Sequence, residues 1–496
     1  MNEISRRRFI RLGASAAATA SLPVWLGGCS DGSDGNYERV GEVSAFVKMP
    51  LPQDPQGRWW LSDNYAPVLE ERETADLRIV GELPAALNGV YVRNGSNGED
   101  TDHWFLGHGM LHGIRLEDGK AQWYRNRYIQ TSLRDAGTDD LVPTDPVSSY
   151  SNVAPIFHAN KLLTMGEIGL PYESLPEDLS TVGVYDFAGR MNGSMTAHPK
   201  ICPVSGDMLF FGYDFLPPYL MFYQANAAGE LVRSEAITLP ASVMMHDFAI
   251  TENYVIFYDL PVVFDLDQAV AGNGFPFGWS SEHVPRMGVM PRSGGDADIM
   301  WFEVNNGFIF HTMNAYENPG NPRELLVHAS RIDAPFWEES NQDLSKPSYL
   351  TQYRFNLDAA TVSEQRINDV PMDFGQVNRN FIGQPYRYGY GLDFTERSGP
   401  LNLPTARAII RHDHQTGNFE RHVPEGDLQL GEAIFVPEPG TNGEEEGWLL
   451  CLAFNEARNQ SDLLVIDARD FSGSPVARVE LPYRVPFGFH GVWVGD

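Results

Sequence analysis

The sequence predicts an all-β fold, a seven-bladed β-propeller, from three observations. From about residue 75 onward, short apolar or alternating runs are broken by turn-forming residues about every ten positions. His198 and His246 are each followed by a turn and a strand-like run that ends in Tyr-Asp, which is a faint internal repeat. Four histidines in similar apolar settings are separated by 48, 65 and 179 residues, so they can meet only where distant strands converge. Blades of about 60 residues would give about seven over residues 40–496, whereas a sandwich would not explain such separations.

The individual strands are predicted from runs rich in β-branched and aromatic residues that are bounded by Gly, Asn, Asp or Pro. Amphipathic helical patterns are scarce, and residues 335–344 and 343–355 are expected to form short helices or lid segments. The 47 Gly and 34 Pro supply the many turns that such a fold needs. The clearest strand runs cover residues 89–95, 208–215, 253–261, 300–313, 447–455 and 462–470.

The first residues predict export and are excluded from the fold. The run SRRRFI at residues 5–10 has the form of a twin-arginine signal. An Ala-rich stretch follows and ends in two glycines directly before Cys29, as at a lipoprotein cleavage site. We expect residues 1–28 to be a signal peptide and Cys29 to carry lipid. An uncleaved membrane anchor is the alternative, although Pro23 and small residues interrupt the stretch.

This reading also predicts where the protein works. Residues 29–40, rich in Ser, Asp and Gly, would form a flexible tether, and residues 41–496 a single propeller domain. The protein would be exported by the twin-arginine pathway and held on a membrane through Cys29, on the periplasmic or cell-surface side. A formal charge of −30 argues against a nucleic-acid partner, which would need a basic surface. Cys202 and Cys451 are interpreted as small buried residues, and their pairing is left open.

Four histidines are the candidate metal ligands: His198, His246, His311 and His490. Each lies among Phe, Met or Gly residues, and a metal is one way to satisfy both ring nitrogens of a buried histidine. Imidazole suits zinc, copper, iron and nickel alike, so the spacing does not choose the metal. Four protein ligands on an octahedral ion leave two positions open, which favours iron chemistry over a closed structural zinc.

Three acidic residues in apolar runs are candidates to orient the ligand rings: Glu167, Asp373 and Glu432. A ligand histidine usually donates its outer N–H to a carboxylate, which fixes the tautomer and the ring orientation. An ordinary carboxylate at the end of a strand is the alternative for each of them.

Several stretches resemble the carotenoid cleavage oxygenases, a family that includes the lignostilbene dioxygenases and the retinal-pigment-epithelium isomerase. The resemblance covers about residues 75–496, and its motifs occur in the family's order: LNGVYVRNGSNG, TAHPK, HDFAITENYVIF, FHTMNAYEN, DFGQVNRNFIGQPYRYGYG, GEAIFVP and FHGVWV. It implies a seven-bladed propeller with a dome of loops and short helices over one axial Fe(II). It also implies His198, His246, His311 and His490 as iron ligands, supported by Glu167, Asp373 and Glu432.

The departures from the family pattern include two positions beside the predicted metal centre. The family usually has glutamate where this chain has Asp373, so we expect the hydrogen bond to the ligand histidine to be lengthened, water-mediated or absent. Lignostilbene-type members carry a lysine, which contacts a phenolic oxygen, directly before the first supporting glutamate. This chain has Gly166 there, which lowers the expectation of a hydroxystilbene substrate.

The remaining histidines are given structural interpretations. His103, His108 and His112 lie among glycines in a hairpin-like run, so no second metal site is predicted there. His412 and His414 are expected on one face of a solvated edge strand. The aromatic and proline-rich segments 215–223 and 276–279 are interpreted as core or dome packing, with the wall of an apolar substrate tunnel as the alternative.

Together these observations predict an exported, lipid-anchored Fe(II) dioxygenase that cleaves a C=C bond of a conjugated apolar substrate with O2, giving carbonyl products. Carotenoids or apocarotenoids are favoured over lignostilbenes or other phenylpropenoids. Two alternatives stay open: a non-oxidative isomerase on the same fold, and a binding module whose metal is structural or lost.

Overall fold

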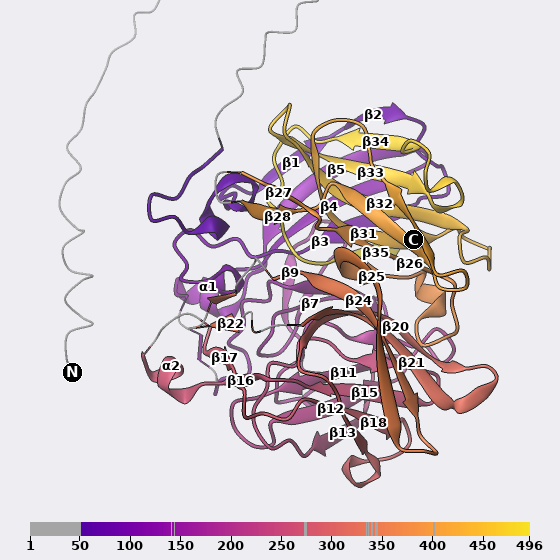
Figure 1. The fold of residues 1–496 in the computed structure, drawn as a ribbon. Helices are drawn as coiled ribbons and strands as arrows, with labels where there is room; N and C mark the ends of the chain where they lie inside the picture. Colours follow the sequence, from indigo (N-terminus) through magenta and orange to yellow (C-terminus); the bar gives the residue numbers. More distant parts are fainter. Residues whose placement is uncertain are drawn as a thin grey trace, which may run out of the picture. The chain divides into compact units, whose positions relative to one another are not determined.

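The computed structural model describes residues 51–139, 141–142, 144–271, 275–333, 335, 337–338, 341–342, 346–399 and 402–496. The expected signal peptide, Cys29 and the tether lie outside these residues. Within them, six sheets of four to seven strands form seven blades, and the predicted all-β propeller is confirmed (Figure 1). The seven-stranded sheet counts as two blades, because β25 pairs with β24 through residues 361–371 and with β26 only after that.

Blades 2 and 3 follow chain order, whereas blade 1 combines strands from both ends of the described chain. Blade 1 consists of β35 (Gly491–Gly495), β3 (Gly89–Arg93), β4 (Met110–Glu117), β5 (Lys120–Tyr128) and β1 (Arg72–Ala75). Blade 2 consists of β6 (Ala154–His158), β7 (Lys161–Met165), β8 (Tyr172–Ser174) and β9 (Thr181–Val184). Blade 3 consists of β10 (Lys200–Ile201), β11 (Met208–Tyr213), β12 (Leu220–Ala225) and β13 (Leu231–Ile237).

The other four blades continue in chain order. Blade 4 consists of β14 (Ala249–Ile250), β15 (Tyr254–Asp259), β18 (Arg286–Pro291) and β19 (Met300–Glu303). Blade 5 has β20 (Phe308–Asn318), β21 (Asn321–Ile332), β24 (Ser348–Asn356) and the first part of β25 (Thr361–Gln376). Blade 6 has the end of β25, β26 (Tyr388–Asp393), β29 (Ala408–Asp413) and β30 (Asn418–His422). Blade 7 has β31 (Leu428–Pro437), β32 (Gly447–Asn455), β33 (Gln460–Asp467), β34 (Ala477–Glu480) and β2 (Arg78–Gly81).

The ring is closed by strands from both ends of the described chain. The C-terminal strand β35 pairs antiparallel with β3, from Gly89 opposite Gly495 to Arg93 opposite Gly491 (Figure 1). The early strand β2 pairs with β34 and completes the outer edge of blade 7. The predicted strands form where expected. After a turn, β11 follows His198 and ends at Tyr213, and β15 follows His246 and ends at Asp259.

Short helices and hairpins form the dome that the family resemblance implies. In Figure 1, α1, α2 and the hairpin β16–β17 lie to one side of the blades. The 3-10 turn that begins at Trp104 also belongs to this layer. Trp104 packs against Phe489, the residue before His490, with ring centroids 4.4 Å apart. The helices are α1 (Ser132–Ala136) and α2 (Leu266–Ala271), with 3-10 turns at Trp59–Leu61, Asp63–Tyr65, Trp104–Leu106, Asp296–Asp298, Arg379–Phe381 and Ala468–Asp470. The hairpins are β16 (Val262–Phe264) with β17 (Phe277–Trp279), β22 (Trp337–Glu338) with β23 (Asn341–Gln342), and β27 (Glu396–Ser398) with β28 (Leu403–Thr405).

The expected helix or lid at residues 343–355 is wrong over most of its length. Residues Ser348–Asn356 form β24, a central strand of blade 5. Thr351, Tyr353 and Phe355 are buried at every second position, which is the period of a strand rather than of a helix. The packing of this segment inside blade 5 therefore decides its structure, and the local sequence pattern does not.

Two further expectations concern cysteines and membrane spans. Cys202 and Cys451 are both buried and free, as predicted for small core residues. Among the described residues, no helix is long and apolar enough to cross a membrane.

The expected solvated edge at His412 and His414 is wrong. His412 is 1% exposed in β29, and His328 on the neighbouring blade is also 1% exposed. His328 Nδ1 lies 2.6 Å from Tyr386 Oη, and the same hydroxyl lies 3.1 Å from His414 Nε2. Burial lowers the pKa of His328 and of His412 to about 4. Blades 5 and 6 are thus joined by a buried cluster of neutral histidines, which we call the His328 cluster.

The His328 cluster predicts acid lability. Between pH 6.5 and 4 the unfolded chain binds more protons than the folded one, so the free energy of unfolding falls as pH falls through this window. Each such ring accounts for a loss on the order of 3 kcal/mol. His412→Phe removes one titrating group, and urea unfolding from pH 7 to 4 should show a shallower pH dependence than the parent. An unchanged slope would contradict the assignment.

Candidate metal centre

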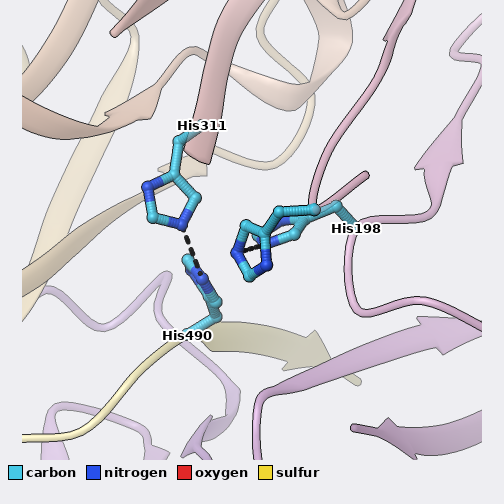
Figure 2. Close-up of side chains that lie close together, drawn as sticks. His198, His311 and His490 are labelled. Carbon is cyan, nitrogen blue, oxygen red and sulfur yellow. Dashed lines mark hydrogen bonds between the residues drawn. The ribbon is translucent and has the colours of Figure 1, made fainter. Parts of the chain in front are cut away.

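The four histidines predicted as ligands meet at the centre of the ring. His198 and His246 shortly precede β10 and β14, His311 lies in β20, and His490 directly precedes β35. One nitrogen from each ring lies within 4.8 Å of the other three, and no other such group of three or more His, Cys, Asp or Glu occurs in the described part of the chain. The Nε2 atoms of His198 and His246 are 3.0 Å apart, and those of His311 and His490 are 3.2 Å apart (Figure 2).

This donor set fits a divalent transition metal. Two imidazole nitrogens that bind one ion at about 2.1 Å and at right angles lie about 3.0 Å apart, which matches the observed pairs. Burial, followed by the neighbouring histidines, holds the pKa of His198 well below its usual value, so the ring is neutral as a metal ligand requires. Four imidazoles on a six-coordinate ion leave two positions open for reaction.

Glu167, one of the three acidic residues predicted to orient the ligand rings, lies beside His246. Glu167 Oε1 lies 2.7 Å from His246 Nδ1, a contact within hydrogen-bond distance but outside hydrogen-bond angles. Burial lowers the pKa of His246, but the carboxylates of Glu167, Asp247 and Asp373 together outweigh it and the net shift is upward. Tyr213 donates to the other oxygen, Glu167 Oε2, at 3.0 Å. The sequence analysis did not predict this role for Tyr213. The only indication in the sequence is that Tyr213 ends the strand that follows His198.

The expectation of a long or water-mediated contact at Asp373 is wrong. Asp373 Oδ1 lies 2.8 Å from His311 Nδ1. The backbone makes up for the shorter side chain, because β25 is irregular between Asp373 and Gln376 and Phe374 has φ of 56°. A methyl group at Gly375 would lie 2.9 Å from the Cα of Met313, so this part of β25 lies directly against β20.

Glu432 supports His490 and is itself held in place. Glu432 Oε1 lies 2.9 Å from His490 Nδ1, and Oε2 accepts from the backbone N–H of Gly491 at 2.7 Å. Gln376 donates to Oε1 at 2.8 Å, a contact that sequence reasoning missed. Burial raises the pKa of Glu432, but His490, the Gly491 N–H and His311 together outweigh it and the net shift is downward, so the carboxylate stays ionised. The irregular part of β25 thus supports two ligands, one through Asp373 and one through Gln376.

Aromatic rings surround the ligands. Phe374 lies 4.9 Å from the His311 ring and 5.3 Å from the His490 ring, and Phe310 lies 5.2 Å from the His246 ring. Phe310 and Phe374 thus give three of the four rings an apolar neighbour.

Two cavities adjoin the centre or its supports. One, of about 440 Å³, is lined by innermost strands of the blades and by His198 and His490. The other, of about 500 Å³, is lined by Tyr213 and by Leu216, Pro217 and Pro218. Segment 215–223 therefore lines a cavity, as its tunnel interpretation requires, whereas Phe277 is fully buried and packs in the dome.

The histidines of the N-terminal hairpin have separate partners. His103 Nδ1 accepts from the N–H of Phe105 at 3.1 Å, and His112 Nδ1 lies 3.0 Å from Tyr124 Oη. His108 Nε2 lies 3.0 Å from Asp139. These contacts fit the structural interpretation of the three rings.

An all-β ring with four axial histidines and a carboxylate behind three of them defines a non-haem metalloenzyme. The sequence matches the retinal pigment epithelial membrane protein family over residues 65–495. It is 35% identical to a carotenoid 9,10(9',10')-cleavage dioxygenase of Crocus sativus, covering 88% of this chain and 89% of the relative. It is 32% identical to a carotenoid cleavage oxygenase of Mycobacterium tuberculosis, covering 88% and 97%.

A solved structure gives the same result. The lignostilbene dioxygenase of Pseudomonas brassicacearum superposes with a TM-score of 0.81 at 27% identity, covering 90% of this chain and 100% of that one. The chain belongs to the carotenoid cleavage oxygenase family, as its motifs indicate. It is an iron-dependent dioxygenase with one iron per chain.

Proposed function

We propose that this enzyme cleaves a C=C bond of a carotenoid or apocarotenoid to carbonyl products, with His198, His246, His311 and His490 holding Fe(II). The observation that carries the proposal is the four-imidazole centre flanked by aromatic rings. Fe(II), when bound there, supplies the activation of dioxygen for oxidative cleavage.

The residues of the chain orient the metal ligands and shield the reacting bond from water. Glu167, Asp373 and Glu432 orient three of the ligand rings through their Nδ1 atoms. Phe310 and Phe374 offer apolar faces on which a conjugated chain can lie, and they keep water from the reacting bond. No side chain is required to transfer a proton.

Gly166 favours a polyene over a hydroxystilbene. A Cβ at this position would lie 3.3 Å from Ser149 Oγ and 3.3 Å from the backbone nitrogen of Ser151. The position has no ammonium group to meet a phenolic oxygen, and its surroundings leave little room for one. The lignostilbene dioxygenase relative keeps phenylpropenoids as the second candidate class.

Labelled dioxygen tests the proposal. The Fe(II)-loaded protein would be incubated under ¹⁸O₂ with carotenoids, apocarotenoids and hydroxystilbenes, and the products analysed by mass spectrometry. We expect labelled carbonyl fragments from the carotenoid or apocarotenoid arm, with label washout measured by adding each labelled aldehyde to buffer. Cleavage of hydroxystilbenes alone would overturn the substrate class. Substrate turnover without oxygen consumption would establish an isomerase, and iron-loaded protein without any turnover would favour a binding module.

We also propose that residues 1–28 direct twin-arginine export and that Cys29 is lipidated, which would anchor the enzyme on the periplasmic or cell-surface side. The support is the sequence motif SRRRFI and the small residues before Cys29. Metabolic labelling with a radioactive fatty acid should mark the full chain but not Cys29→Ser. Equal labelling of the two would contradict the assignment.

A further inference from the structure

The four ligand histidines come from four separate sheets. β10, β14, β20 and β35, the strands nearest to them, belong to blades 3, 4, 5 and 1. Backbone ladders bind strands within each of these sheets but do not join the four ligand segments to one another. The relative positions of the rings therefore depend on side-chain contacts that cross from blade to blade.

For three of the ligand histidines, a carboxylate from another blade makes this contact. Glu167 follows β7 of blade 2 and reaches His246 of blade 4. Asp373, where β25 enters blade 6, reaches His311 of blade 5, and Glu432 of blade 7 reaches His490 of blade 1. No carboxylate among the described residues contacts the ring of His198. The segment that carries this ring contributes only the two-residue strand β10 to its sheet.

A buried ion pair ties this segment to its neighbours. Lys200, two residues after His198, places Nζ 2.7 Å from Asp247 Oδ1, next to His246 in sequence. Asp247 Oδ2 accepts from the backbone N–H of Thr312, next to His311, at 2.7 Å. The Asp247 side chain is 1% exposed and that of Lys200 is 17% exposed. One carboxylate thus joins blades 3, 4 and 5 directly beside three ligands.

We propose that the Lys200–Asp247 ion pair is the positioning element for His198, in the place that a carboxylate takes for each of the other three ligands. It sets the distance of the His198 segment from the His246 and His311 segments. A charge pair suits this role because a buried carboxylate left without its cation is strongly unfavourable, so the two segments stay together.

The alternative is that the pair only stabilises the fold. Blade 4 offers a matched control in Asp259, which is 0% exposed and lies 2.7 Å from both Arg286 Nε and His283 Nε2. Asp259 lies in β15 and contacts no ligand segment through these bonds. Asp259→Asn therefore removes a buried, paired carboxylate from the same blade without disturbing the proposed positioning.

The experiment uses the full chain, stripped of metal and titrated anaerobically with Co(II). Three quantities are measured for each variant: Co(II) affinity by chelator competition, the visible d–d spectrum of the Co(II) form, and the thermal midpoint of the metal-free protein. The spectrum reports coordination geometry, which a loss of global stability does not alter. The variants are Lys200→Met, Asp247→Asn, Lys200→Arg and the control Asp259→Asn.

We expect Lys200→Met and Asp247→Asn to weaken Co(II) binding about 10- to 100-fold and to change the spectrum. Lys200→Arg should keep both near the parent, and Asp259→Asn should lower only the thermal midpoint. Asp247→Asn decides the matter if Lys200→Met does not fold, because asparagine has the same shape and can still accept from Thr312. Parent affinity and spectrum in Asp247→Asn, or an equal change in Asp259→Asn, would overturn the proposal.

Discussion

His246→Ala is expected to abolish oxidative cleavage and to reduce bound iron far below one per chain. The variant removes one of four converging nitrogens and leaves Glu167, 6% exposed, without the ring that it contacts. We expect cleavage activity to fall by more than about 100-fold, since replacing even an outer partner of a metal ligand costs about 10- to 100-fold. Iron content by elemental analysis and product formation under saturating substrate would measure both effects.

His158→Ala is the matched control for this substitution. His158 is 7% exposed, and its Nε2 lies 3.0 Å from the carbonyl oxygen of Gly206, away from the four ligands. The control should lose stability but keep one iron per chain. If His246→Ala retained full iron and activity, His246 would not be a ligand.

Glu432→Gln should weaken metal binding about 10- to 100-fold while the protein stays folded. The carboxylate accepts from His490 Nδ1 and from the Gly491 N–H, so it fixes which nitrogen of the ring faces the metal. An amide lacks the negative charge that makes the ring a stronger donor, and it can present an N–H to the ring instead. Isothermal titration of the metal-free protein with Fe(II) under nitrogen would give the affinity.

Glu425→Gln controls for the loss of one negative charge, because Glu425 is exposed in the turn that precedes β31. It should bind Fe(II) as the parent does. Equal affinities of Glu432→Gln and the parent would show that the carboxylate does not tune its ligand.

The sequence was sufficient to predict the kind of fold and which four histidines come together. Histidine in an apolar run is unusual enough that four of them, with the motifs around them, indicated one centre and a ring of blades. The structure places His198, His246, His311 and His490 within one such cluster. Glu167 and Glu432 were predicted in the same way, as acidic residues in otherwise apolar runs.

The parts that the sequence could not predict depend on contacts between distant segments. The reach of Asp373 depends on an irregular backbone in β25 and on its closeness to β20, neither of which side-chain length reveals. The burial of His412 depends on the neighbouring blade, which covers a strand that reads as polar. Gln376 and Lys200 belong to residue types that are common on protein surfaces, so the sequence does not indicate their contacts with Glu432 and Asp247.

The pairing of β35 with β3 has a consequence for biogenesis. A ribosome makes β3 early and makes His490, the last of the four ligands, several hundred residues later. A nascent chain that already holds His198, His246 and His311 still has an open ring and three donors. The complete four-nitrogen centre can therefore form only after β35 has been made, in the same step that closes the ring.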